Sequence, residues 1–245
     1  MKKNLRKLVA VGLLVLVIGV IVKIPARVAL QLVPDSVLIS GASGTIWNGR
    51  AGAVLVSGIY LRNVEWRTKP FGFLTGKLAL GIRAAPASGF VESDLALGLN
   101  GAATLSDLNA SIPLSVFADA INVPNLSGST SLQFDYLTVL DGVPTSASGT
   151  VQIADMTVPM VHPGSLGGYT LEFSDFENGV IASIEDTDGV VDIAGTLTLA
   201  DDRSYSLLAQ LAATSTTPAE LTRQIEFLPD GNAAGQHELR LEGSL

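Results

Sequence analysis

The sequence predicts a mainly β protein, in which a single N-terminal transmembrane helix precedes a large antiparallel domain with one or two short helices. We expect this domain to be a curved sheet or a sandwich. Past residue 27, short segments alternate apolar with small or polar residues, as strands with one buried face do. Glycines punctuate these segments, and helical patterns are scarce. Without long helical crossovers, the roughly ten to twelve expected strands are antiparallel.

Composition supports a folded domain and excludes several kinds of chemistry. Of the 245 residues, 47% are hydrophobic and only 16% are charged, which excludes a disordered chain. An all-β domain of this length is common as a single unit. The chain contains no cysteine, so it has no disulfide, no thiolate nucleophile and no cysteine-ligated metal.

The N-terminus predicts a membrane anchor. Residues 1–7 carry four positive charges and no acid, and the fifteen residues from Leu8 to Val22 are apolar without a break. A cleaved signal peptide is the alternative, but no A-x-A-like site follows the apolar run. We therefore expect a cytoplasmic segment at 1–7, an uncleaved anchor at 8–26, and a domain at 27–245 on the far side of the membrane.

Charge is distributed unevenly along this domain. Six positive residues and one acid lie between Arg50 and Arg83, whereas three positive residues and twenty-one acids follow from Ala84 onward. The basic part is next to the anchor, where it would face anionic lipid; a solvated protein face explains the same residues. The acidic remainder lacks a basic, aromatic-rich stripe, so binding of nucleic acid is disfavoured.

The first expected hairpin follows shortly after the anchor. Asn48-Gly49 lies between two strand-like segments, 44–47 and 50–56, and this pair favours a tight type I′ turn. Ser57-Gly58 marks the next turn, before a third strand over 59–67.

Two tryptophans fall on this hairpin and its neighbour. We expect Trp47 and Trp66 to pack together at the membrane-proximal end of the sheet, or to lie at the level of the lipid headgroups.

Further strands are expected from alternating side chains and from glycine cues. The alternating apolar positions are Leu78, Leu80 and Ile82; Leu95, Leu97 and Leu99; Leu132, Phe134 and Tyr136; Tyr205, Leu207, Ala209 and Leu211; and His237, Leu239 and Leu241. Several segments begin with glycine followed by a small or β-branched residue, at Gly44, Gly128, Gly149, Gly195 and Gly243. Such a glycine suits a chain that turns into a strand.

Two short helices complete the expected elements. Thr217-Pro218-Ala219-Glu220 has the form of a capping box with proline at the first helical position. Leu221, Ile225 and Leu228 then lie on one helical face, before Pro229 ends the helix. A single helical turn is also expected after Pro113.

The sequence offers little catalytic chemistry. The two histidines, His162 in an expected turn and His237 on an expected terminal strand, have no paired ligand spacing, so a zinc site is unsupported. Neither a G-x-S-x-G motif nor a P-loop is present. The acidic run 185–189 resembles a calcium loop in composition, but an Asp-Gly hairpin turn explains it more simply. We expect no enzyme activity, no metal and no cofactor.

The most specific part of the sequence is the pair of motifs around the two tryptophans. The run LISGASGTIWNGRAGAV is followed by LRNVEWRTKPFGFLTGKLALGI, and the chain closes with HELRLEGSL. These segments resemble the type II secretion system protein N family, with its G-x-x-GTLW-x-G-x-A hairpin and its V-x-W-x-x-x-P strand. The motif positions here are Gly41, Gly44, Trp47, Asn48, Gly49, Val64, Trp66 and Pro70.

The resemblance implies a role without catalytic residues. It implies an accessory or assembly component of the type II secretion machinery, anchored in the bacterial inner membrane with a periplasmic β domain. Its partners would be other inner-membrane components of that machinery, and the lipid bilayer through the anchor.

A protein of a different class stays open from the residues themselves. Many strands carry few charges on either face, so a curved sheet could cradle acyl chains in an apolar groove, as a lipid-handling or envelope-bridging protein would. A hydrolase is the weakest alternative.

Overall fold

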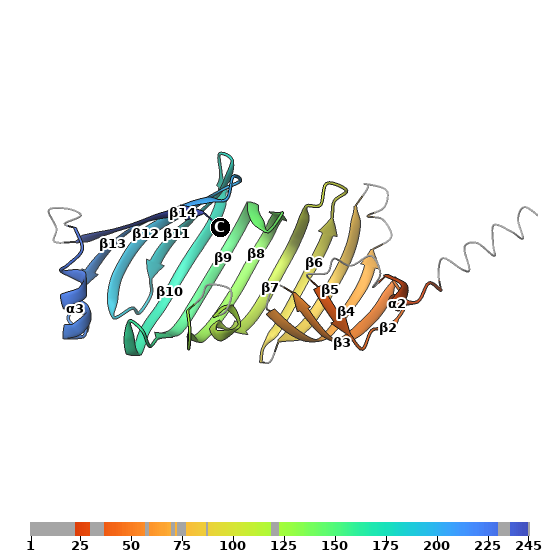
Figure 1. The fold of residues 1–245 in the computed structure, drawn as a ribbon, viewed down its shortest axis with the longest axis horizontal. Coiled ribbons are helices and arrows are strands. Elements are labelled where there is room, and N and C mark those ends of the chain that lie inside the picture. Colours follow the sequence, from red (N-terminus) through yellow and green to blue (C-terminus); the bar gives the residue numbers. More distant parts are fainter. Residues whose placement is uncertain are drawn as a thin grey trace, which may run out of the picture.

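The strands of the protein lie side by side in one long sheet (Figure 1). The computed structural model describes residues 23–29, 37–56, 59–69, 72, 77–86, 88–118, 123–229 and 236–244. Within them the fourteen strands are β1 (Val37–Ser40), β2 (Ser43–Gly44), β3 (Asn48–Val56), β4 (Ile59–Lys69), β5 (Leu78–Pro86), β6 (Phe90–Leu97), β7 (Ala103–Pro113), β8 (Ser127–Leu140), β9 (Val143–Val158), β10 (His162–Phe176), β11 (Gly179–Asp186), β12 (Val191–Ala200), β13 (Ser204–Ala213) and β14 (His237–Ser244).

The topology of the sheet is a simple meander. All pairs are antiparallel, and the strands follow one another in chain order from β1 to β14, except that the two-residue β2 pairs only with β3. The predicted mainly β, antiparallel fold is therefore confirmed, and its form is one open sheet rather than a sandwich. The sheet has more strands than expected. One of them, β10, shows only weak alternation in the sequence because its first half is rich in glycine.

The sheet has one apolar and one polar face. Residues that are paired across strands point to the same side of a sheet, so the register gives whole rows. One row is Leu108, Phe134, Gly149, Phe173, Ala182, Leu197, Leu207 and Leu241. The adjacent row on the opposite face is Asn109, Gln133, Thr150, Glu172, Ser183, Thr196, Leu208 and Arg240.

The central core lies on the apolar face. Leu108, Phe134 and Val180 are among its buried members. The Phe134 and Phe173 rings meet with centroids 5.4 Å apart. Both aromatic residues pair with Gly149 in the strand between them, and a Cβ on Gly149 would lie 2.6 Å from Phe134 Cδ1. Gly149 is therefore needed for close packing within β9, not for a turn.

The sheet is strongly curved, as the sequence predicts. Strands β9 and β12 are three positions apart, which would separate them by about 14 Å in a flat sheet. Their Cα atoms nevertheless come within 8 Å of one another. This curvature buries part of the apolar face without a second sheet. The 3-10 helix η3 (Leu114–Phe117), which is the helical turn predicted after Pro113, also packs against β8 and reaches β4.

Helix α3 (Ala219–Ile225) covers the apolar face near the distal end of the sheet (Figure 1). Its Leu221 and Ile225 are one turn apart, and both are buried in one cluster with Leu166, Tyr169 and Val191. The predicted amphipathic helix is thus confirmed in place and in the orientation of Leu221 and Ile225, but it ends at Ile225, before Leu228.

The predicted start of α3 is wrong in detail. Pro218 is the N-cap residue, and no side chain caps the helix. Thr217 instead donates its hydroxyl hydrogen to the carbonyl oxygen of Val190. Its hydroxyl oxygen also accepts a bond from the Thr214 amide at 2.6 Å. The threonine therefore ties the loop before α3 to the start of β12 rather than closing a capping box.

Two residues predicted to line an apolar strand face lie elsewhere. Leu99 follows the end of β6 and is 96% exposed. The register of β8 shifts between Phe134 and Tyr136, because a β-bulge inserts one residue there. Tyr136 consequently leaves the apolar face, and Leu137 packs against the central core in its place.

The predicted anchor lies almost entirely outside the described part of the chain. Of residues 8–26, the structure describes only those from Lys23 onward. The short helix α2 (Ala26–Ala29) begins at the last of them. Within the described residues, no helix is long and apolar enough to cross a membrane.

Candidate functional site

The glycine-rich motif forms the corner where β2 turns into β3. Gly41 and Gly44 have positive φ angles of 68° and 88°, a conformation that glycine adopts without steric cost. The turn spans Thr45 to Asn48, with the Thr45 amide donating to Asn48 O at 2.9 Å and the Asn48 amide to Thr45 Oγ1 at 3.2 Å. The two-residue turn predicted at Asn48-Gly49 is wrong, because both residues lie in β3 and Gly49 pairs with Gly44.

Trp66 explains why the motif needs Gly49. The two residues are paired across β3 and β4. A Cβ on Gly49 would overlap the indole ring, 2.8 Å from Trp66 Cε2, and would lie 2.7 Å from Ser43 O. The same indole donates its Nε1 hydrogen to Thr45 O at 3.3 Å. Trp66 therefore closes over the corner and bonds to its backbone.

Thr68 fixes the remaining backbone of the corner. Its hydroxyl donates to Ile46 O at 2.8 Å, and its amide donates to Trp47 O at 2.7 Å. Thr68 is itself buried. The corner is thus held by hydrogen-bond donors from β4. The sequence analysis did not predict this role for Thr68, the threonine in EWRTKP.

The other motif residues are structural or lie outside the description. Val64 is buried in a small cluster with Ala51 and Ala84. The Trp47 side chain is half-buried, and its packing against Trp66 stays a prediction. Pro70 is outside the described residues.

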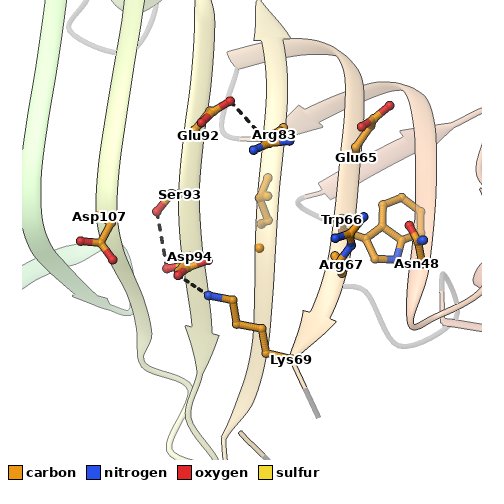
Figure 2. Close-up of a pocket in the computed structure, with 12 residues that line it drawn as sticks. Asn48, Glu65, Trp66, Arg67, Lys69, Arg83, Glu92, Ser93, Asp94 and Asp107 are labelled. Atoms are coloured by element: carbon orange, nitrogen blue, oxygen red, sulfur yellow. Dashed lines mark hydrogen bonds and ion pairs between the residues drawn. The ribbon is translucent and has the colours of Figure 1, made fainter. Parts of the chain in front are cut away.

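A charged groove lies across β4 to β7, next to the corner (Figure 2). It has a volume of about 340 Å³. Lys69 forms an ion pair with Asp94, and Arg83 Nε lies 3.1 Å from Glu92 Oε1. Both pairs are exposed to solvent.

Charges of opposite sign alternate along the groove. Successive positions in one cross-strand row are Arg50, Glu65, Arg83 and Glu92. Of the basic residues between 50 and 83 that suggested contact with anionic lipid, Arg50, Lys69 and Arg83 therefore have acidic neighbours on adjacent strands. This arrangement agrees with a solvated protein face and gives the groove no dominant charge.

A second polar network lies on β8, β9 and β10. Asp175 accepts hydrogen bonds of 2.8 Å from Tyr136 Oη, Ser146 Oγ and the Ala147 amide. The bonds from Ser146 and Tyr136 lower the pKa of Asp175, and the bond to Asp175 raises the pKa of Tyr136. The last backbone pair of β9 and β10 is Gly149 with Phe173. Just beyond it, the Asp175 carboxylate accepts the hydrogen bond of the Ala147 amide, so a side chain continues the contact between the two strands. The network joins β8, β9 and β10 through hydrogen bonds to one carboxylate.

The two histidines lie on different strands, His162 on β10 and His237 on β14. His237 begins β14, and its Nδ1 lies 3.1 Å from Leu228 O. His162 is not in a turn as predicted, because it pairs with Val158 as the first residue of β10. Within the described ranges, no group of three or more histidine or acidic side chains is arranged to hold a metal ion.

The acidic run 185–189 spans the end of β11 and the start of its connection to β12, as the predicted hairpin requires. Asp186 Oδ1 accepts a bond of 3.0 Å from the Ile193 amide. The Thr187 amide donates to Gly168 O and the Val190 amide to Leu166 O, both at 3.0 Å. The connection is therefore wider than a two-residue Asp-Gly turn, and its backbone is fastened to β10.

The molecule also presents an open edge and an apolar surface. β14 is the last strand of the sheet. Leu78, Leu97 and Leu241 are large apolar side chains that remain exposed, and the register places them on the apolar face. Unpaired strand edges and exposed apolar side chains are features through which proteins bind other molecules.

Comparison with known proteins agrees with the motifs. Residues 35–240 match the family described as "Type II secretion system (T2SS), protein N". A "Type II secretion system protein N" of Aeromonas hydrophila is 24% identical over 249 residues, covering 97% of this chain and 98% of the relative. A protein of the same description from Vibrio cholerae serotype O1 is 25% identical over 253 residues, covering 98% of this chain and all of the relative.

No solved structure matches the chain. The family match extends from the residues before β1 to the middle of β14, and so spans nearly the whole sheet. The chain belongs to the type II secretion system protein N family.

Proposed function

We propose that the protein is an accessory or assembly component of the type II secretion system, acting through protein–protein contacts of its β domain. The observation that carries this proposal is the family match over residues 35–240. Two relatives named for the same system also align with almost the entire chain. The proposed role is structural and includes no catalytic step.

The proposed location is the bacterial inner membrane. The basic segment 1–7 would lie in the cytoplasm, and the apolar run within 8–26 would anchor the chain. The sheet would then project into the periplasm, where other inner-membrane components of the machinery are its expected partners. Strand addition at an open edge of the sheet is the binding mode that this architecture favours.

Deletion of the gene tests the role. We expect secretion of a type II substrate to fall in the deletion strain and to recover when the full-length chain is restored. Site-specific photocrosslinkers on β1, the edge strand at the opposite end of the sheet from β14, should then capture another component of the machinery. Undiminished export together with an absence of such crosslinks would contradict the proposal.

The apolar face supports a second candidate, a lipid-handling protein that holds acyl chains. The specific observation is the row of leucine, phenylalanine and alanine side chains that runs from β7 to β14 without a charged residue. Part of this face remains exposed, including 38% of Leu97.

A photoreactive residue at position 97 tests the lipid candidate in cells. The matched control is position 96, since Ala96 pairs with Thr104 on the opposite face of the same strand. Phospholipid adducts at position 97 but not at position 96, identified by mass spectrometry, would support the groove. Equal labelling at both positions, or labelling at neither, would contradict the lipid-handling candidate.

A further inference from the structure

Over its second half, the outer edge of β14 has no backbone partner among the residues that the structure describes. The Glu238 amide donates to Pro229 O at 2.9 Å, so it points away from β13. Backbone groups alternate sides along an antiparallel strand, and β13 and β14 pair without a register shift. Arg240, Glu242 and Ser244 therefore also direct their backbone groups outward. Among the described residues, Pro229 is the one backbone partner on this edge.

The side chains on this edge form a self-complementary pattern. Arg240 and Glu242 lie on the polar face, with Arg240 Nε 2.9 Å and Nη2 2.7 Å from Glu242 Oε1. Leu241 lies between them on the apolar face and is 48% exposed. Arg240 is one of only three positive residues after Arg83, in a region with twenty-one acids. On the edge strand, the positive charge of Arg240 thus lies between the acidic residues Glu238 and Glu242.

We propose that two copies of the chain join edge to edge through their β14 strands, antiparallel and symmetric about Leu241. In this register Arg240 of each copy lies opposite Glu242 of the other. Both residues direct their backbone groups outward, so they form hydrogen-bonded pairs. The two Leu241 side chains face each other on the apolar side, where each covers the exposed surface of the other. The result is one continuous sheet with a continuous apolar face.

Charge and backbone geometry select this register over the other symmetric ones. Pairing centred on Arg240 would oppose two arginines, and pairing centred on Glu242 would oppose two glutamates, which is unfavourable in directly paired positions. Pairing centred on Leu239 would need the outward amide of Glu238, which already donates to Pro229 O. In the register centred on Leu241, Glu238 lies opposite Ser244, outside the two central pairs. Its central Arg240–Glu242 pairs combine opposite charges with backbone groups that have no partner among the described residues.

A disulfide crosslink tests this register in the full-length chain in its membrane. The protein contains no cysteine, so Leu241→Cys introduces a single thiol. In the proposed dimer the two positions form a non-hydrogen-bonded pair with Cα atoms about 4.5 Å apart, within the range for a disulfide.

Leu239→Cys is the matched control. It lies on the same face of the same strand, but the two copies of position 239 are about 13 Å apart along the strands, too far for a disulfide. Under mild oxidation we expect a covalent dimer from Leu241→Cys and none from Leu239→Cys. Monomer from Leu241→Cys, or equal dimer from both variants, would overturn the proposal.

Charge exchange gives an independent readout that a misfolded variant cannot imitate. Arg240→Glu and Glu242→Arg should each raise the dissociation constant of the dimer by about tenfold or more, because each opposes like charges at both pairs. A mixture of the two variants restores opposite charges at both pairs, so it should form a heterodimer in a sedimentation assay. Homodimers of unchanged affinity, or a mixture that stays monomeric, would overturn the register.

The dimer does not depend on the proposed function. Absence of the crosslink with a normal effect of gene deletion on secretion would remove the dimer alone. Crosslinking together with undiminished export in the deletion strain would remove the secretion role alone.

Discussion

The two ends of the sheet are held in different ways. At the β2–β4 end, a tryptophan ring and a threonine hydroxyl donate to the backbone of one corner, and the ring needs a glycine beneath it. At the β10–β13 end, α3 covers the apolar face with two aliphatic side chains, Leu221 and Ile225. The first end depends on particular atoms, whereas the second depends on apolar area.

This difference explains where the sequence is most specific. Few residue types can donate a hydrogen bond to one particular carbonyl oxygen, and only glycine leaves room for a ring packed directly on its Cα. Such positions therefore accept one or two residue types. A buried aliphatic position accepts several residue types of similar volume. The motif positions around the two tryptophans lie at the first end. At the second end the resemblance is confined to the closing HELRLEGSL segment, and α3 carries no motif. Four substitutions sharpen this comparison, from the largest effect to the smallest.

Loss of apolar area at the α3 end should have the largest effect. Leu221→Ala removes a side chain that is only 4% exposed, so we expect the free energy of unfolding to fall by about 2–5 kcal/mol. The denaturant midpoint measures this change. Gln224→Ala, on the exposed side of the same helix, should change the midpoint little. Equal effects of the two variants would show that α3 does not stabilise this end.

A side chain at Gly49 should be nearly as damaging at the other end. Gly49→Ala forces the Trp66 ring and Ser43 O away from their positions, at a cost of about 1–3 kcal/mol. Gly52→Ala is the matched control in the same strand, since its Cβ would meet Ser40 O at an ordinary 3.7 Å. The comparison is made by denaturant unfolding of both variants. A tolerated alanine at position 49 would mean that the glycine is not required by the ring.

Removal of one hydrogen bond at the corner should have a smaller effect. Thr68→Val keeps the shape of the side chain but leaves Ile46 O without its 2.8 Å donor, which should cost about 1 kcal/mol. Thr68→Ser keeps the hydroxyl and loses a methyl group, so it separates bonding from packing. If the valine variant is the more stable of the two, packing rather than the hydrogen bond holds the corner.

The smallest expected effect is a pH dependence in the middle of the sheet. The pKa of Asp175 is lowered by its bonds from Ser146 and Tyr136, so its contribution to stability is present above the unfolded pKa near 3.9. This contribution is lost as the pH falls through the lower folded pKa. The melting temperature of the wild type should therefore exceed that of Asp175→Asn at pH 6, and the difference should shrink below about pH 4. A difference that does not change with pH would assign the effect to shape alone.

Much of the fold follows from the sequence, because alternation and scarce helical signal are local properties. The strands at 78–82, 205–211 and 237–241 and the helix with Leu221 and Ile225 lie where the patterns predict them. β10 is less evident, since the glycines and proline in HPGSLGGYTLEF hide its alternation. The face of Tyr136 depends on a bulge in the pairing of β8 with β9, and a single strand carries no record of that register.

Glycine is the residue whose structural role the sequence predicts least well. Gly49, Gly149 and Gly243 look like turn residues in the sequence, yet each lies within a strand beneath or beside an aromatic ring. The partners are Trp66, Phe134 and Tyr205, and each belongs to the neighbouring strand. A glycine opposite an aromatic residue gives the same local signal as a glycine in a turn. The two become distinguishable only once the strands are paired.

The sequential strand order has a consequence for how such a chain is made and how its length can vary. From β3 onward, each strand needs only the strand before it as a template, so the sheet can grow in step with the emerging polypeptide and needs no late, distant segment to begin. A hairpin can also be inserted or removed along the row without altering the connectivity of the others, much as units are added to a repeat array. The number of hairpins therefore sets the length of the sheet across its strands.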